Sequence, residues 1–364
     1  MSFCIHIIAG ARPNFMKIAP LWHALSKEPW CTTKIIHTGQ HYDASMSGSF
    51  FQDLNLPTPH HALNVGSGSH TEQTANIMMA YEEVCHDNRP DLVIVVGDVN
   101  STIATALVAK KLGFCLAHLE AGLRSGDRTM PEEINRLATD AISDILWTPS
   151  ADANENLLNE GVDKSKIDFV GNIMIDSFEL QREAIEKHPL HELQFPRKSY
   201  ATVTLHRPSN VDTIKPLTRI VDCLLEVADH IPLAFPIHPR TEKCLLKHGL
   251  MEKLSHKNIQ TLPPLPYRAF MSLVNSSRLV ITDSGGIQEE TSYLGIPCLT
   301  LRENTERPIT ISQGTNKLVS IDGLLKQVRS SLAADSANKA PQIELWDGKT
   351  AERITEALKV RFLA

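Results

Sequence analysis

The stretch DLVIVVGDVN, residues 91–100, decides the class of fold. Its centre, Leu92–Val96, is an unbroken apolar run rich in valine, which is typical of a strand covered on both faces of a parallel sheet. A helical pattern follows over Ser101–Leu112, and a second apolar strand is predicted at Cys115–Leu119. A strand, a helix and another strand in this order favour a parallel pair joined by a right-handed crossover.

This alternation of apolar strands and helices runs through the whole chain. In the first half, the pattern predicts helices at Pro13–Lys27 and Thr71–Cys85 and strands at Phe3–Ala9, Lys34–Thr38, Asp144–Thr148 and Lys166–Val170. After about residue 198 the pattern starts again, with strands predicted at Ala201–Leu205, Leu233–Ile237, Asn258–Thr261, Arg278–Thr282 and Cys298–Leu301. The fold class is therefore expected to be α/β, with two doubly wound, Rossmann-like domains that face each other across a cleft.

A polar, proline-bearing stretch marks the expected domain boundary. Residues 187–199 are weakly periodic, and the hinge is expected there or as early as Gly171. We predict a first domain at residues 1–172 and a second at 173–349, since a length of 364 residues favours more than one domain. The last segment, 350–364, is predicted as an amphipathic helix that can pack back on the first domain.

Composition and charge exclude several classes of protein. Of the residues, 42% are hydrophobic and 21% charged, as in folded globular chains. The formal charge of −6, without a long block of like charges, argues against nucleic acid or a membrane as a partner. No apolar stretch approaches the ~20 residues of a membrane span, and the apolar N-terminal run is predicted as a strand rather than a signal peptide.

The cysteines and histidines predict neither disulfides nor a metal site. Seven cysteines occur without a CxxC spacing, mostly in apolar runs, so we expect reduced thiols in a cytoplasmic protein. Sixteen histidines occur without an HExxH spacing. His37 and His41 flank a Gly-Gln turn instead of sharing one face of a helix, so no metal is predicted.

The first predicted strand is followed by a basic helix start. Gly10-Ala11-Arg12-Pro13 opens a helix that carries Lys17. Arg12 and Lys17 can converge on an anion near that N-terminus, where Pro13 suits the first helical position. The alternative is a plain strand-to-helix turn with solvated basic residues, and we favour the anion site.

Three carboxylates follow strands or open a helix in the first domain. Asp98 follows the strand Leu92–Val96, Glu120 follows the next strand, and Glu132 stands in a Pro-Glu-Glu helix start. Helix capping or the helix dipole explains each carboxylate alone. Because strand ends meet at one edge of a parallel sheet, the three together also fit acid–base catalysis, and both explanations stay open at this point.

The second domain carries a histidine and a small-residue turn at its strand ends. His206 follows the strand Ala201–Leu205 and can hold or release a proton near neutral pH. In TDSGGIQEE, residues 282–290, a turn of Ser284, Gly285 and Gly286 opens a helix and can present N–H groups to a diphosphate. Glu290 is placed to accept hydrogen bonds from ribose hydroxyls.

The alternative for this turn is a flexible loop with an ordinary helix cap. We favour nucleotide-diphosphate binding, because the turn lies at the expected switch region of the sheet and because Arg302 and Arg307 follow the next strand.

Together these blocks resemble the UDP-N-acetylglucosamine 2-epimerase family, which uses the two-domain glycosyltransferase-B architecture. The resemblance runs over almost the whole chain, and its most specific parts are HLEAGLRSGDRTMPEEINR at 118–136 and TDSGGIQEETSYLGIPCLTLRENTERP at 282–308. It implies a homodimer that needs no cofactor or metal, with a UDP-sugar as its partner.

The resemblance also implies roles for individual residues. It implies that Arg12 and Lys17 contact the diphosphate. The catalytic groups that it implies are Asp98, Glu120, Glu132 and His206. The residues that it implies bind the nucleotide are Ser284, Gly285, Gly286, Glu290 and Arg307. The expected reaction inverts C2 of UDP-GlcNAc to give UDP-ManNAc through elimination of UDP and a glycal. Alternatives are a modified UDP-sugar, such as a 2,3-diacetamido uronate, or a hydrolysing 2-epimerase that releases ManNAc and UDP.

Three departures from the family pattern stand out. The usual His-Arg-Arg-Glu-Asn reads His-Arg-Pro-Ser-Asn at 206–210. The turn with Gln40 and His41 lacks a second glutamine, and the loop 66–70, Gly-Ser-Gly-Ser-His, lacks an arginine. The last two lie where bacterial members bind an allosteric UDP-GlcNAc, so they put that regulation in question, but not the nucleotide site.

Overall fold

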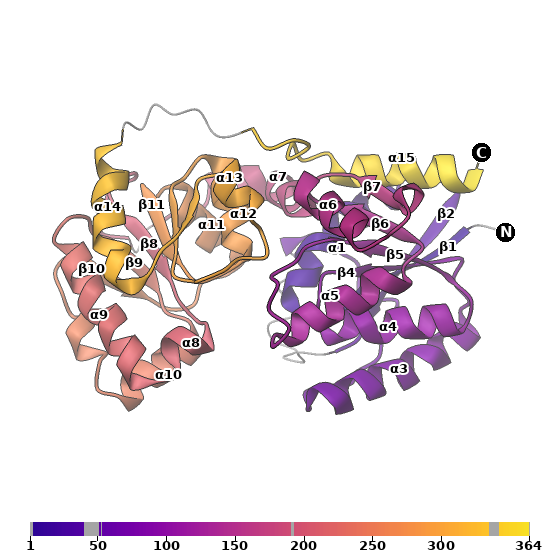
Figure 1. Ribbon diagram of the computed structural model, residues 1–364, viewed down its shortest axis with the longest axis horizontal. Coiled ribbons are helices and arrows are strands. Elements are labelled where there is room, and N and C mark those ends of the chain that lie inside the picture. Colours follow the sequence, from indigo (N-terminus) through magenta and orange to yellow (C-terminus); the bar gives the residue numbers. More distant parts are fainter. Residues whose placement is uncertain (1–2, 40–50, 52, 191–192, 335–341, 364) are drawn as a thin grey trace. The chain divides into compact units, whose positions relative to one another are not determined.

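The computed structural model describes residues 3–39, 51, 53–190, 193–334 and 342–363, which fold into two compact units (Figure 1). Unit 1 comprises Met1–Leu180 and Glu344–Ala364, and unit 2 comprises Gln181–Ile343. Each unit has its own parallel sheet.

The sheet of unit 1 has the order β3-β2-β1-β4-β5-β6-β7. Its strands are β1 (Phe3–Ala9), β2 (Cys31–His37), β3 (His61–Ala62), β4 (Leu92–Val96), β5 (Cys115–Leu119), β6 (Ile145–Thr148) and β7 (Ile167–Phe169). Its helices are α1 (Arg12–Leu25), α3 (His70–Asp87), α4 (Asn100–Lys111), α5 (Pro131–Ile142), α6 (Ala151–Asn159), the 3₁₀ helix η1 (Lys164–Lys166), α7 (Ile173–Glu186) and α15 (Thr350–Leu363). The order reverses between β1 and β4, which makes that position the switch point of the sheet.

The sheet of unit 2 has the order β10-β9-β8-β11-β12-β13. Its strands are β8 (Ala201–Thr204), β9 (Leu233–Pro236), β10 (Ile259–Leu262), β11 (Leu279–Thr282), β12 (Cys298–Thr300) and β13 (Asn316–Leu318). Its helices are α8 (Pro208–Val211), α9 (Ile214–Ala228), α10 (Pro239–Lys247), η2 (Glu252–Leu254), α11 (Tyr267–Asn275), α12 (Gly286–Leu294), α13 (Ile309–Ser312), η3 (Ile321–Gly323) and α14 (Leu324–Ala333). The switch point lies between β8 and β11.

The central strands are buried on both faces, which explains their unbroken apolar sequences. Every residue of β4 is buried, and so is every residue of β11. At about 25 cal/mol per Å² of apolar surface, burial of this kind is the main stabilising contribution in each unit. The predicted α/β class with two doubly wound sheets is confirmed, and the predicted strands are all present.

The structure adds two short edge strands that the sequence did not predict. β3 has two residues and β13 has three, too few for a recognisable periodic pattern. Both lie at the edge of their sheets, where pairing with one neighbouring strand defines them.

The predicted boundary at residue 172 lies just before α7. In the structure, the division between the two units falls inside α7, between Leu180 and Gln181. The first half of α7 belongs to unit 1, because Ile173, Ile175 and Phe178 are fully buried there. The hydroxyl of Ser177 on the same helix donates a hydrogen bond to the Met16 carbonyl of α1.

The C-terminal helix packs on unit 1. α15 lies along α1, with Lys359 Nζ 2.9 Å from Glu28 Oε1. At its start, the Ala351 N–H donates a hydrogen bond of 2.8 Å to Asp176 Oδ1 on α7. The returning segment begins at Glu344, earlier than the helix itself.

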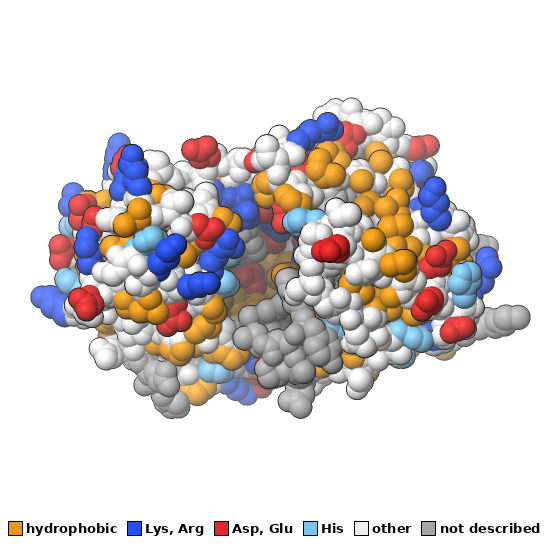
Figure 2. Space-filling model, turned by 90° about the horizontal axis from the view of Figure 1, so that it is seen from below, with side chains coloured by type: hydrophobic (Ala, Val, Ile, Leu, Met, Phe, Trp, Pro, Cys, Tyr) orange, Lys and Arg blue, Asp and Glu red, His pale blue; other side chains and the backbone are white. Residues whose placement is uncertain are grey.

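The surface carries charged groups of both signs. Figure 2 looks onto the face where α3 lies, and it shows hydrophobic side chains gathered on that face of unit 1. Met79 of α3 is 59% exposed. Within the part of the chain that the structure describes, no helix is long and apolar enough to cross a membrane.

Candidate active site

The switch point of unit 1 ties the start of α1 to the end of β4. Asn14 Oδ1 accepts hydrogen bonds from the N–H groups of Gly10 and Ala11, at 3.1 and 2.8 Å. Its Nδ2 donates to the Val96 carbonyl at 3.1 Å. The segment that carries Lys17 is therefore fixed against the strand that leads into Asp98. Arg12 is the first residue of α1, and its side chain lies outside the described atoms.

Lys17 and Glu120 meet at this edge of the sheet as an ion pair. The Lys17 ammonium contacts Glu120 Oε2, and the two residues are 8% and 4% exposed. Glu120 has a φ of +74°, which is unfavourable for a residue with a Cβ and is found mainly at functional sites. Gly97 follows β4 with a φ of +68°, and a Cβ there would lie 3.1 Å from Lys17 Nζ and 3.3 Å from Glu120 Oε2. Glycine therefore leaves the space that the ion pair fills.

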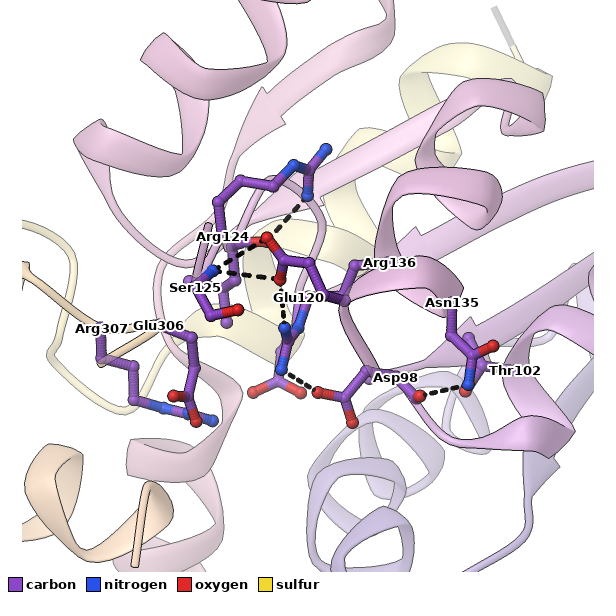
Figure 3. A network of polar contacts seen from close by, with 12 residues as sticks. Asp98, Thr102, Glu120, Arg124, Ser125, Asn135, Arg136, Glu306 and Arg307 are labelled. Carbon is purple, nitrogen blue, oxygen red and sulfur yellow. Dashed lines mark hydrogen bonds and ion pairs between the residues drawn. The ribbon is translucent and has the colours of Figure 1, made fainter. Parts of the chain in front are cut away.

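Asp98 is held by two residues of α5 (Figure 3). Arg136 Nη2 lies 2.5 Å from Asp98 Oδ2, and Asn135 Nδ2 donates to the Asp98 carbonyl at 2.8 Å. The Asp98 side chain is 29% exposed, whereas that of Arg136 is 5% exposed. An accessible carboxylate is thus oriented by a buried guanidinium.

The buried member of the Glu132-Glu133 pair is Glu133. Its carboxylate accepts hydrogen bonds from the N–H groups of Ser125 and Gly126 at 2.9–3.1 Å, and it pairs with Arg136 Nη1 at 2.6 Å. Burial raises the pKa of Glu133, but these hydrogen bonds outweigh burial and hold the pKa below its ordinary value. Glu132 is partly exposed in the first turn of α5 and joins no ion pair with another described residue.

A buried histidine joins the loops that follow β4 and β5. His118 Nδ1 lies 2.6 Å from Asp140 Oδ1, and Nε2 lies 2.8 Å from the Gly97 carbonyl. Asp140 Oδ2 accepts the Gly122 N–H at 3.0 Å and lies 2.7 Å from Arg124 Nη1. Both ring nitrogens of His118 therefore face oxygen atoms that can accept a hydrogen bond. Burial raises the pKa of Asp140, but the charges of His118 and Arg124 outweigh burial and lower it.

Sequence reasoning missed these supporting residues, and the signals for them are weak. Glu133 and Arg136 stand three apart on α5, a spacing that places two side chains on one helix face. His118 and Asp140 come from different elements, and nothing local in the sequence links them.

In unit 2, His206 is oriented by Asp283 at the switch point between β8 and β11. His206 Nδ1 lies 3.2 Å from Asp283 Oδ1, and the His206 side chain is 36% exposed. Asp283 is fully buried and accepts the N–H groups of His206 and Arg207 and the side-chain amide of Asn210. Burial raises the pKa of Asp283, but the hydrogen bond from His206 leads the contacts that lower it.

The Ser284–Gly286 turn follows Asp283 and opens α12. The Ser284 N–H donates to Thr282 Oγ1 at 2.9 Å. Glu290 is 5% exposed, accepts a hydrogen bond of 2.8 Å from the Tyr267 hydroxyl, and has its pKa raised by burial to about 7. The helix start thus offers N–H groups that have no partner within the helix, with a buried carboxylate one turn on.

Arg307 is engaged by two carboxylates inside unit 2. Its Nε lies 2.9 Å from Glu289 Oε1, and its Nη1 lies 2.5 Å from Glu306 Oε1. Arg302 Nη2 contacts the other oxygen of Glu306 at 2.9 Å.

The structure brings most of the sequence-predicted residues to two switch points. Lys17, Asp98 and Glu120 share that of unit 1, and His206 and the Ser284 turn share that of unit 2. Gln40 and His41 lie outside the described residues. Among the residues that are described, no group of three or more His, Cys, Asp or Glu is arranged to hold a metal ion.

Two Rossmann-like sheets, with polar residues gathered at the switch point of each, define a two-domain α/β enzyme. The chain belongs to the UDP-N-acetylglucosamine 2-epimerase family, whose model matches residues 23–359. The resemblance noted in the sequence is thereby confirmed.

Two relatives and one solved structure cover nearly the whole chain. The UDP-N-acetylglucosamine 2-epimerase of Methanocaldococcus jannaschii is 43% identical over 97% of this chain and 98% of the relative. The UDP-2,3-diacetamido-2,3-dideoxy-D-glucuronate 2-epimerase of Pseudomonas aeruginosa is 40% identical over 96% and 98%. The crystal structure of the M. jannaschii enzyme in complex with UDP-GlcNAc and UDP has a TM-score of 0.89 at 42% identity, over 98% of this chain and 100% of that one.

Proposed function

We propose that this protein is a non-hydrolysing epimerase that inverts C2 of a UDP-linked 2-acetamido sugar and interconverts UDP-GlcNAc and UDP-ManNAc. The observation that carries the proposal is the gathering of Asp98, Glu120 and Lys17 at the switch point of unit 1, in a chain that is 43% identical to a 2-epimerase over nearly its full length. No cofactor is part of the proposal.

The chemistry explains why carboxylates are needed. The C2 hydrogen of the sugar is not acidic, because no carbonyl group stands next to C2. We infer that a base removes this proton while the C1–O bond to UDP breaks, which leaves a 2-acetamidoglucal and UDP. Addition of a proton to the other face of C2 and re-addition of the UDP oxygen to C1 give the epimer. The reaction needs acid–base groups for both faces of C2 and stabilisation of the departing diphosphate.

Unit 1 supplies the acid–base groups in this proposal. Asp98 is accessible and oriented by Arg136, so it suits direct contact with the sugar. Glu120 stands in a strained backbone conformation beside Lys17, which keeps its carboxylate in one place. Glu132 is partly exposed at the start of α5 and is the third candidate.

Unit 2 supplies the nucleotide site in this proposal. The Ser284-Gly285-Gly286 turn at the start of α12 receives the diphosphate, where N–H groups and the helix dipole favour negative charge. Glu290 accepts hydrogen bonds from the ribose hydroxyls. His206, with Nδ1 directed at Asp283, presents its other nitrogen for proton transfer or charge stabilisation.

A second candidate substrate is a UDP-2,3-diacetamido uronate. The observation in its favour is the 40% identity to the P. aeruginosa enzyme, close to the 43% of the M. jannaschii enzyme. The homodimer and the cytoplasmic location expected from the sequence stay predictions.

Incubation of the purified protein with UDP-GlcNAc alone tests the proposal. We expect UDP-ManNAc to appear in the proton NMR spectrum. A glycosyltransferase or a nucleotide-sugar binding protein leaves UDP-GlcNAc unchanged, and a hydrolysing enzyme accumulates free ManNAc and UDP. A parallel run with the 2,3-diacetamido uronate identifies the preferred sugar by its kcat/KM.

A further inference from the structure

The main chain before Asp98 is held by a buried side chain of the neighbouring strand. Gly97 directly precedes Asp98, and its φ of +68° turns the chain away from the sheet after β4. Its N–H donates to the Leu119 carbonyl of β5 at 3.0 Å. Its carbonyl lies 2.8 Å from Nε2 of His118, so a side chain of β5, and not its main chain, bonds this carbonyl.

The main chain after Glu120 is also held by buried side chains. Glu120 and Gly122 have positive φ values of +74° and +81°. This backbone is strained at Glu120, which has a Cβ, and such strain persists only where the surrounding structure fixes it. Asp140 Oδ2 accepts the Gly122 N–H at 3.0 Å, and Asn156 Nδ2 donates to the Gly122 carbonyl at 2.9 Å. The conformation at Glu120 therefore depends in part on Asp140.

One contact between two side chains connects these supports. His118 Nδ1 lies 2.6 Å from Asp140 Oδ1. A continuous chain of contacts therefore runs from the Gly97 carbonyl through the imidazole and the carboxylate to the Gly122 N–H. The main chain beside Asp98 and the main chain beside Glu120 are thus fixed to each other through His118 and Asp140.

The helix that carries Asp140 also orients the side chain of Asp98. Arg136 lies one turn before Asp140 on α5, and its Nη2 is 2.5 Å from Asp98 Oδ2 (Figure 3). Both the carboxylate of Asp98 and the main chain next to it are therefore tied to α5, the first through Arg136 and the second through His118.

Burial prevents direct contact of either residue with a substrate. His118 is 0% exposed and Asp140 is 3% exposed. A carbonyl oxygen only accepts hydrogen bonds, so the contact with Gly97 uses Nε2 of His118 as its donor. Any effect of this pair on the reaction must therefore pass through the residues that it holds.

We propose that His118 and Asp140 are positioning residues for the epimerisation, and that they set the spacing between the carboxylates of Asp98 and Glu120. The reaction removes a proton from one face of C2 and adds one to the other, so both acid–base groups must be correctly placed around one carbon atom. A misplacement of about 1 Å costs up to ~100-fold in rate. The inference rests on the proposed function, because it takes Asp98 and Glu120 as the acid–base groups.

Two substitutions of His118 separate its contact with Gly97 from its contact with Asp140. The side-chain nitrogen of glutamine reaches the place of Nε2, and that of asparagine reaches the place of Nδ1. His118→Gln therefore keeps a donor for the Gly97 carbonyl. His118→Asn keeps a donor for Asp140 but leaves the Gly97 carbonyl without its partner.

The two variants are expected to differ in turnover but not in nucleotide binding. We expect His118→Asn to lower kcat about 10- to 100-fold and His118→Gln to retain most of the wild-type kcat. The affinity for UDP, measured by calorimetry, should stay unchanged in both, because the proposed nucleotide site lies in unit 2. Each variant loses one buried contact, so both should lower the midpoint of thermal unfolding to a similar extent. A loss of stability alone therefore does not account for the expected difference in kcat.

His6→Asn is the matched control. His6 is a histidine of β1 in the same sheet, it is 0% exposed, and its Nδ1 lies 3.2 Å from the Tyr81 hydroxyl. Its substitution should lower the midpoint of thermal unfolding and leave kcat unchanged, because no contact links it to Gly97 or Gly122 in the part of the chain that the structure describes.

The inference is overturned if His118→Asn has the kcat of the wild type, if His118→Asn and His118→Gln lose kcat equally, or if UDP affinity falls in parallel with kcat. Should His118→Asn not fold, Asp140→Asn takes its place. That variant keeps an oxygen for the Gly122 N–H but loses the charge that orients the ring, and a folded Asp140→Asn with wild-type kcat overturns the inference as well. A wild-type protein that epimerises no UDP-sugar refutes the proposed function instead.

Discussion

The ammonium group of Lys17 and the carboxylate of Glu120 form an ion pair inside unit 1, with side chains that are 10% and 3% exposed. The resemblance placed Lys17 at the diphosphate. In this structure, however, the charge of Lys17 is paired with the carboxylate of Glu120, which directly follows β5. Burying both charged groups away from water costs free energy. Deleting only one of them by mutation leaves the other as an uncompensated buried charge. The pair therefore fixes α1 and the Glu120 loop to each other.

The substitution Lys17→Met tests whether the ion pair with Glu120 stabilises the folded protein. The variant removes the cation next to the buried Glu120, so we expect the free energy of unfolding by urea to fall by about 3–5 kcal/mol, together with turnover. The double variant Lys17→Met/Glu120→Gln should regain much of the stability and none of the turnover. A single variant as stable as the wild type would show that the pair does not hold the loop.

Glu132→Gln and Glu133→Gln form a matched pair of neighbouring substitutions. Glu133 binds two N–H groups and Arg136 in a buried site, so Glu133→Gln should cost about 1–3 kcal/mol of stability. Glu132→Gln should change stability by less than about 0.5 kcal/mol and lower kcat, since Glu132 is partly exposed and proposed to be catalytic. Urea unfolding and initial rates on both variants decide the roles, and the reverse pattern contradicts the assignment.

This pair also shows where sequence reasoning ends. The Pro-Glu-Glu start of α5 was recognisable, and the resemblance selected Glu132. Which of the two glutamates turns inward depends on how α5 packs against the loop at Ser125 and Gly126, and no local pattern carries that information. The same holds for His118 and Asp140, which meet from β5 and α5.

Strand prediction succeeded where burial was complete. The run Leu92–Val96 and the run Leu279–Thr282 are buried throughout, so hydrophobicity alone located them. The edge strands β3 and β13 have mixed burial and few residues, so only their pairing partners define them. The boundary between units was placed too early because α7 begins as a core helix of unit 1 and ends in unit 2.

Glu290 should make unliganded stability depend on pH. Its pKa is raised by burial from the ordinary 4.5 to about 7, so the folded protein holds a proton that the unfolded chain has released between these values. Stability contributed by this group is therefore highest below about pH 4.5 and falls as the pH rises to 7. Glu290→Gln should remove this slope and stabilise the unliganded protein at pH 8 by about 1–3 kcal/mol.

Glu290→Gln should also weaken the binding of UDP by about 1–3 kcal/mol, because an amide cannot accept hydrogen bonds from two ribose hydroxyls as a carboxylate does. Urea unfolding at pH 5 and pH 8, together with calorimetry, measures both effects. Unchanged UDP affinity in a folded variant removes Glu290 from the ribose site.

The sequence and contacts of the loop at residues 66–70 lead us to expect that the enzyme needs no activator. His70 Nδ1 lies 3.2 Å from Asn100 Oδ1, Asn100 donates to Gln73, and Gln73 donates to the Gly66 carbonyl, so a chain of hydrogen bonds holds the loop to α4. Without an arginine there, a second UDP-sugar gains little differential affinity between two states. With UDP-ManNAc supplied alone, we expect the initial rate to depend hyperbolically on the concentration of UDP-ManNAc. A rate near zero until trace UDP-GlcNAc is added shows that an allosteric site is present.

The fate of the C2 hydrogen tests the account most directly. The protein is incubated with UDP-GlcNAc in D₂O and followed by proton NMR. Elimination and re-addition predict that UDP-ManNAc forms and that deuterium enters C2 of both epimers, with no accumulation of free ManNAc. Asp98→Asn should slow both processes at least ~100-fold, since the amide cannot accept the proton. Epimer formed with its original C2 hydrogen, or UDP-GlcNAc that stays unchanged, contradicts the account.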